Sequence, residues 1–113
     1  MSEKYLKKYR LRKKKDFLSL IYAKKQIYGK MIIIDYLFTG RDFSRLGISP
    51  TVKFGKAFLR NLFKRQIREI YRKNYSSLTK AVELNIRPTP FAKKASYFQL
   101  EQEYLFLLKK ILD

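Results

Sequence analysis

The chain has 113 residues, 46% of them hydrophobic, including nine Phe and nine Tyr, which is enough for one domain with a modest core. It carries 27 Lys and Arg against nine Asp and Glu, a formal net charge of +18. It contains no Cys and no His, which excludes disulfides, thiol chemistry and zinc sites built on these residues. Such a charge favours a polyanionic partner. Nucleic acid is the first candidate, an anionic membrane surface the second, and a solvated basic surface without a specific partner the third.

The N-terminal segment is a basic arm. Residues 1–15 hold eight Lys and Arg but one acid, Glu3, a composition typical of a segment that stays extended until it meets RNA. No apolar core of a signal peptide follows it. The longest apolar run, 31–38, contains Asp35 and is too short to span a bilayer. With the absence of Cys, these features predict a cytoplasmic protein.

A short helix is predicted after the arm, over residues 16 to about 25. Asp16 can cap it, and Phe17, Leu20 and Ile21 recur at helical spacing. Gly29 then interrupts the pattern.

Two strands are predicted next. Residues 31–38 are rich in Ile and indicate a strand that is buried on at least one face. Residues 39–42 form a turn signal. Residues 45–52 indicate a second strand, in which Pro50 removes a hydrogen-bond donor and therefore predicts a sheet edge or a bulge.

The second half alternates helix, strand and helix. Helical periodicity covers residues 55–74, strict polar–apolar alternation covers 82–87, and Pro88 and Pro90 end that strand. Residues 97–112 predict an amphipathic helix whose apolar stripe consists of Leu100, Tyr104, Leu107, Leu108 and Ile111. The order of elements predicts a single domain over 1–113, with one sheet and helices packed on it.

The central helix carries a basic ridge. Five basic residues are spaced four apart: Lys56, Arg60, Lys64, Arg68 and Arg72. Asn61 and Arg65 fall on the same side, and the opposite side is predicted to be core: Phe58, Leu59, Leu62, Phe63, Ile67 and Ile70. Like charges four residues apart repel each other by a few tenths of a kcal/mol per pair, and a phosphate backbone would relieve that repulsion. A solvated basic face and a membrane-surface helix are the alternatives, the latter disfavoured because strands flank the helix and would cover its apolar side.

These residues resemble a known family. The stretches RLGIS at 45–49, GKA at 55–57 and RNLFKRQIRE at 60–69 are similar to the protein subunit of bacterial ribonuclease P, whose pattern is Arg-x-Gly-aliphatic-Ser followed by a helix containing Arg-Asn-Arg. Residues 11–12, 16–17 and 86–88 also resemble the family, so the similarity spans nearly the whole chain.

The resemblance implies a fold and a function. The fold is an α/β (α+β) two-layer sandwich in the order αβββαβα, like domains of ribosomal proteins, with a left-handed βαβ crossover where the general rule is right-handed. The function is that of a subunit of an endonuclease for tRNA 5′ maturation. In that enzyme the RNA subunit is the catalyst and binds most of the Mg²⁺. The protein, a monomer in the holoenzyme, binds RNase P RNA and the 5′ leader of precursor tRNA.

The resemblance also assigns residues, none of them catalytic or metal-binding. The residues matched to the catalytic-RNA face are Arg60, Asn61, Lys64, Arg65 and Arg68, to which the basic ridge adds Lys56 and Arg72. The leader cleft is matched by Phe17, Ile21, Tyr22, Tyr36, Ser49, Lys53 and Arg87. Ile21 stands where a second aromatic is usual, with Tyr22 beside it, and Tyr36 could equally be a core residue.

Three departures from the family pattern stand out. Leu62 replaces the second Arg of Arg-Asn-Arg and is predicted to point toward the core. Pro50 and Val52 replace residues that are usually apolar and basic, so the cleft edge is expected to carry one charge less.

Two other functions compete with this one. A ribosomal or ribosome-assembly protein would have the same composition but no role in cleavage. A metal-dependent nuclease in its own right would need converging carboxylates, and the nine acids are scattered along the sequence.

Overall fold

A computed structural model of the chain describes residues 10, 14–15, 18, 25–40 and 42–113. These form four strands and two long helices: β1 (Gln26–Tyr28), β2 (Ile32–Phe38), β3 (Arg45–Ile48), α2 (Ala57–Lys73), β4 (Val82–Pro88) and α3 (Tyr97–Leu112). Short 3-10 turns, η3 (Val52–Phe54), η4 (Tyr75–Ser77) and η5 (Pro90–Lys94), lie between them. Most of the helix predicted over 16–25 lies outside the described residues.

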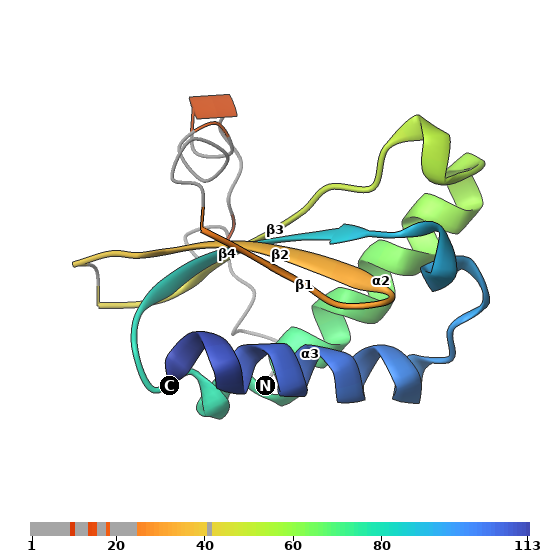
Figure 1. Cartoon of the computed structure of the whole chain (residues 1–113). Helices are drawn as coiled ribbons and strands as arrows, with labels where there is room; N and C mark the ends of the chain where they lie inside the picture. The colour runs from red at the N-terminus through yellow and green to blue at the C-terminus, as the bar shows by residue number, and fades with distance from the viewer. Residues whose placement is uncertain (1–9, 11–13, 16–17, 19–24, 41) are drawn as a thin grey trace.

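The sheet has the strand order β1-β2-β4-β3. β2 is antiparallel to both β1 and β4, whereas β3 is parallel to β4. The parallel pair is connected by α2, which is the crossover element that the family resemblance implies. Both helices lie on one face of the sheet, giving the expected two-layer α+β architecture (Figure 1).

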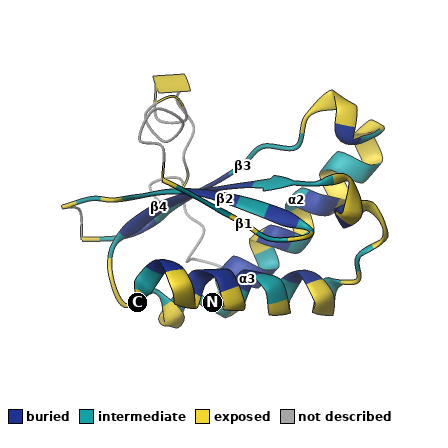
Figure 2. Cartoon of the chain, viewed as in Figure 1, coloured by how far each residue is buried: buried dark blue, intermediate teal, exposed yellow. Residues whose placement is uncertain are grey.

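The strand register assigns each side chain to a face. Ile34 pairs with Ile86 and Tyr36 with Leu84, toward the helices, while Asp35 pairs with Asn85 on the opposite face. Burial is concentrated in the central strands and on the inner sides of the helices (Figure 2). The core contains Ile32, Ile34, Leu46, Val82, Leu84 and Ile86 from the sheet, and Phe63, Ile67, Ile70, Tyr71, Leu100, Tyr104, Leu107, Leu108 and Ile111 from the helices.

Within the described residues, the predicted elements agree with this structure in type and differ from it at three places. β1 was not located by any pattern, because three residues are too few to show a period. β3 ends at Ile48 and does not reach 52, because Pro50 cannot donate to a ladder and the chain turns into η3. The alternating strand β4 was identified correctly, yet its polar residues Glu83 and Asn85 are buried as well. The apolar stripe of α3 is confirmed.

Glu103 ties α3 to the β1–β2 turn. Its carboxylate accepts hydrogen bonds from the backbone N–H groups of Lys30, Met31 and Ile32, at 3.0, 2.7 and 2.8 Å. A Cβ on Gly29 would overlap the Glu103 carboxylate, so a side chain at this position would displace the carboxylate from the turn. One side chain thus anchors the edge hairpin to the helical layer.

Within the described part of the chain, no helix is long and apolar enough to cross a membrane.

Replacing Glu103 by Ala should lower the free energy of unfolding by about 2–3 kcal/mol, because three backbone donors lose a charged acceptor. Urea denaturation followed by circular dichroism measures the loss. The matched control is Gln102→Ala, an exposed neighbour on α3, which should change stability by less than about 0.5 kcal/mol. Equal effects of the two substitutions would contradict the anchoring role.

Candidate nucleic-acid interface

The face of the sheet away from the helices is organised around the buried carboxylate of Asp35. Asp35 is fully buried on the central strand β2. Its oxygens accept from Gln26 Nε2 at 2.8 Å and from Asn85 Nδ2 at 3.2 Å. They also accept from Arg87 Nε and Nη2, both at 2.9 Å. A buried charge is tolerated when it is paired and hydrogen-bonded in this way.

The network crosses the whole sheet. Ser49, just after β3, donates its hydroxyl to Asn85 Oδ1 at 2.8 Å. On the other side, the Tyr28 hydroxyl donates to Gln26 Oε1 at 2.8 Å. A continuous polar row therefore runs from β1 through β2 and β4 to the end of β3. Arg45 and Glu83 form a further ion pair between β3 and β4 on this face.

Two of the predicted leader-binding residues belong to this row. Ser49 and Arg87 are joined through Asn85 and Asp35. The Arg87 side chain is 35% exposed. Its guanidinium is therefore held by the buried Asp35 on one side and reaches solvent on the other. Lys53 is exposed in η3, which follows β3.

Tyr36 does not lie with these residues. The β2 register directs it to the helix side, where it is half-buried against the core. Its ring packs edge-on to that of Phe38, with centroids 6.1 Å apart. Tyr36 is therefore a residue at the edge of the core, and its predicted place in the leader cleft is wrong. Phe17, Ile21 and Tyr22 lie outside the described residues.

The organising residue of this face was not predicted as part of the site. Asp35 was noticed as a charge inside an apolar run, but one sequence does not say which donors surround such a charge. The signal was present in two places: an acid inside the apolar run 31–38 and an Asn within the alternating strand β4. Pairing these two residues requires the β2–β4 register.

The cationic surface of the molecule lies on α2. Its predicted RNA contacts Lys56, Asn61, Arg65 and Arg68 are exposed, while Arg60, Lys64 and Arg72 are half-buried. A spacing of four residues advances about 40° around a helix, so the five-residue ridge winds around the axis and does not keep to one face. Arg60, seven residues before the buried Ile67, lies toward the core side and donates from Nε to the Gly55 carbonyl at 3.1 Å.

Two residues assigned to the apolar half of α2 were placed wrongly. Phe58 is 65% exposed and Leu62 is 39% exposed. The buried stripe consists of Phe63, Ile67, Ile70 and Tyr71. At 100° per residue, Phe58 lies roughly 180° and Leu62 roughly 140° around the axis from Ile67, which places both beside the exposed cations.

Arg72 is partly neutralised. It is paired with Glu69 three residues earlier, with Nε donating to Oε1 at 3.0 Å. The hydrogen bond from Arg72 lowers the pKa of Glu69 below its usual value. Glu69 therefore stays ionised at neutral pH, and Arg72 offers less net charge to a phosphate than Arg65 does.

Five of the seven acids that the structure describes have structural partners. Asp35, Glu69, Glu83, Glu101 and Glu103 each accept a hydrogen bond from a side chain or backbone group. Among the residues the structure describes, no three His, Cys, Asp or Glu side chains are grouped so that they could hold a metal ion. The exposed cations of α2, with Arg87 and Lys53 beside the polar row of the sheet, are suited to binding a polyanion.

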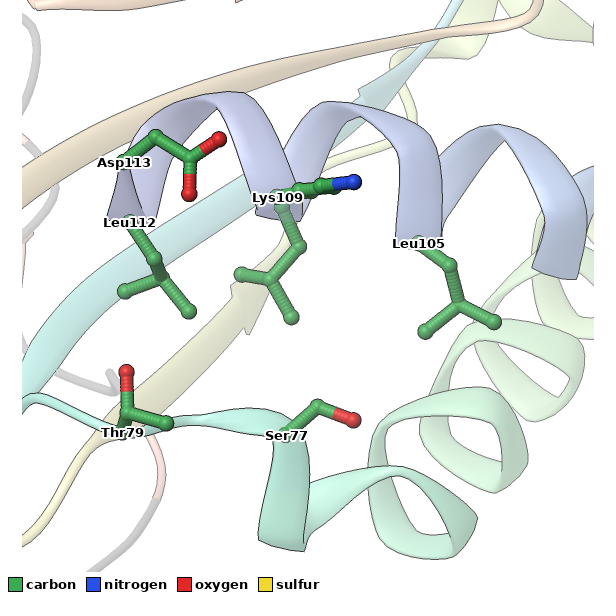
Figure 3. Close-up of a pocket in the computed structure, with 7 residues that line it drawn as sticks. Ser77, Thr79, Leu105, Lys109, Leu112 and Asp113 are labelled. Carbon is green, nitrogen blue, oxygen red and sulfur yellow. The ribbon is translucent and has the colours of Figure 1, made fainter.

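A cavity of about 310 Å³ lies elsewhere, between the C-terminal half of α3 and the 77–79 segment. Leu105 and Leu112 point from α3 toward Ser77 and Thr79 (Figure 3). Its lining contains none of the predicted site residues.

Known proteins resemble the chain over most of its length. The family model described as Ribonuclease P matches residues 6–112. The chain is 32% identical to the Ribonuclease P protein component of Thermotoga maritima, covering 98% of both chains, and 33% identical to that of Alkaliphilus oremlandii, covering 90% of both. The solved RNase P protein from T. maritima superposes with a TM-score of 0.83 at 32% identity, over 89% of this chain and 96% of that one. The Staphylococcus aureus RNase P protein gives 0.82 at 29% identity, over 91% and 94%.

Replacing Asp35 by Asn should lower the free energy of unfolding by about 3 kcal/mol, because it leaves the half-buried Arg87 without its counter-charge. Denaturant titration measures the change. Asp42→Asn is the control, since it removes the same charge from an exposed position and should change stability by less than about 0.5 kcal/mol. An Asp35→Asn protein as stable as the control would contradict the organising role of this carboxylate.

Proposed function

This chain belongs to the ribonuclease P protein family, and on that premise we propose that it binds RNase P RNA and the 5′ leader of precursor tRNA and assists a cleavage catalysed by the RNA. Family membership makes it the protein component of a ribonuclease of tRNA processing, with RNase P RNA as its partner. The binding surfaces, and the division of labour between protein and RNA, are the proposal.

The exposed cationic side of α2 carries the proposal for the RNase P RNA. Lys56, Asn61, Arg65 and Arg68 are exposed there, while the opposite side of the same helix is buried against the sheet. Arg can bind a phosphate through two parallel N–H donors, and Lys acts as a point charge. A membrane-surface role is disfavoured, because the apolar side such a helix would insert is already packed in the core.

The polar face of the sheet is proposed to bind the leader. The guanidinium of Arg87 is held by two hydrogen bonds to Asp35, and Ser49, just after the neighbouring strand β3, is joined to it through Asn85 and Asp35. Lys53 adds an exposed charge just beyond β3. A row of hydroxyl, amide and guanidinium groups suits the phosphates and sugars of a single strand. Phe17, Ile21 and Tyr22 remain expectations for the aromatic and apolar side of the same cleft.

We further propose that the Mg²⁺ of the reaction is held mainly by the RNA. Five of the protein's carboxylates already accept hydrogen bonds within the fold, and phosphate oxygens are suitable ligands for this ion. The protein is proposed to act as a monomer in the holoenzyme, in the cytoplasm.

Reconstitution tests the proposed function. The protein is mixed with a bacterial RNase P RNA at low magnesium, and cleavage of precursor tRNA is measured. We expect stimulation over the RNA alone and no cleavage by the protein alone. Absence of stimulation at any protein concentration would favour a ribosomal or assembly role, and magnesium-dependent cleavage by the protein alone would favour a nuclease in its own right.

The affinity for RNase P RNA should fall steeply with salt, because each neutralised phosphate contributes about 0.9 to the slope of log K against log salt concentration. Arg65→Ala should reduce that slope by about one unit. Lys110→Ala, which removes one exposed charge from α3, should leave it nearly unchanged. Equal slopes for the wild type and Arg65→Ala would contradict a phosphate contact by Arg65.

Phe17→Ala should act on the substrate side. The holoenzyme carrying it should bind leader-bearing precursor tRNA more weakly and mature tRNA about as well as the wild type, since stacking on a leader base would be lost. Arg65→Ala should instead weaken assembly with the RNA and leave the preference for leader-bearing tRNA intact. The same loss of preference in both variants would contradict two separate surfaces.

A further inference from the structure

An apolar spot interrupts the cationic surface of α2. It consists of Phe58 and Leu62, which are four residues apart and 65% and 39% exposed. Arg65 lies two turns after Phe58 and within about 20° of it around the axis. Leu62 stands where the family motif has its second Arg. An apolar side chain therefore stands where the motif has a cation, four residues after the exposed ring of Phe58.

The ring of Phe58 is uncovered within the described part of the chain. Three of the other four exposed Phe rings have a lysine ammonium group over them: Lys80 lies 5.7 Å from Phe38, Lys30 lies 5.4 Å from Phe91, and Lys110 lies 4.5 Å from Phe106. Among the described residues, no cation lies over Phe58 or over Phe98 on α3, although Phe58 is on the helix that carries many cations. Its π face is open to a planar group from outside the chain.

We propose that Phe58 stacks on an unpaired base of the RNA that α2 binds, with Leu62 packing beside it against the same nucleotide. This rests on the proposed function, because α2 must face the RNA. Stacking platforms for nucleic acid combine an aromatic ring with flanking positive charge, and every base offers a π face. The surrounding Asn61, Arg65 and Arg68 provide the polar and charged flank. The stack replaces a salt-sensitive contact by one that salt does not screen.

Affinity measured over a range of salt concentrations tests the stack. With bacterial RNase P RNA as the probe, Phe58→Ala should weaken binding about 5- to 100-fold at every salt concentration and leave the log–log slope unchanged. Phe98→Ala is the matched control, because Phe98 lies on α3 and is also 65% exposed; it should change affinity by less than about twofold. Leu62→Arg, which restores the motif, should steepen the slope by about one unit.

A spectroscopic variant reports the stack directly. The chain contains no Trp, so Phe58→Trp carries a single indole at the proposed position. Its fluorescence should be quenched when the RNA binds, and its affinity should match that of the wild type. The indole of Phe98→Trp should respond little. Circular dichroism checks that both proteins are folded, as expected for exposed positions.

The results separate the stack from the function on which it rests. If Arg65→Ala lowers the salt slope while Phe58→Ala keeps full affinity and the indole fluorescence of Phe58→Trp does not change on binding, the stack is wrong and the cationic surface stands. If neither alanine variant changes RNA binding, α2 does not face the RNA and both proposals fall. If sedimentation shows self-association that Phe58→Ala abolishes without affecting RNA affinity, the spot binds a second copy of the chain and the stack is overturned.

Discussion

The buried carboxylate of Asp35 is the interaction on which the rest of the sheet depends. It gathers donors from β1 and β4, and through Asn85 it connects to Ser49 at the end of β3. A charge at the centre of a four-stranded sheet is stable only if it keeps these partners. The same requirement fixes the guanidinium of Arg87 at the surface, so the contact that stabilises the sheet also orients a proposed RNA-binding group.

The net charge of +18 is concentrated at the surface because of where the acids are placed. Five of the seven acids in the described part of the chain accept hydrogen bonds that hold strands, a turn or a helix in place. Glu103 anchors the β1–β2 turn, and Glu83 pairs with Arg45 between β3 and β4. The acids are thus largely engaged within the fold, and most of the cations remain at the surface. Binding RNA would relieve the repulsion among those cations.

The helical layer could be predicted closely and the polar face only in part. Helical spacing located α2 and α3, since a long periodic segment averages out local exceptions. It failed at Phe58 and Leu62, because both were assigned to the core for their apolar side chains, although they lie roughly 180° and 140° around the axis from the buried Ile67. For Tyr36 the sequence left core and cleft open, and the β2–β4 register decided for the core.

The sequence was sufficient to identify the types of the longer helices and strands, the cationic character and, through the segments at 45–49 and 55–69, the family. Periodicity and motifs are local in the sequence, and net charge is a sum over residues, so one sequence is enough to read them. Only the tertiary structure decided that Asp35 meets Arg87 across 52 residues and that Glu103 meets the turn at Gly29. It also decided that Phe58 is left at the surface of α2. Each of these depends on strand register and helix docking, which packing sets jointly over the whole chain.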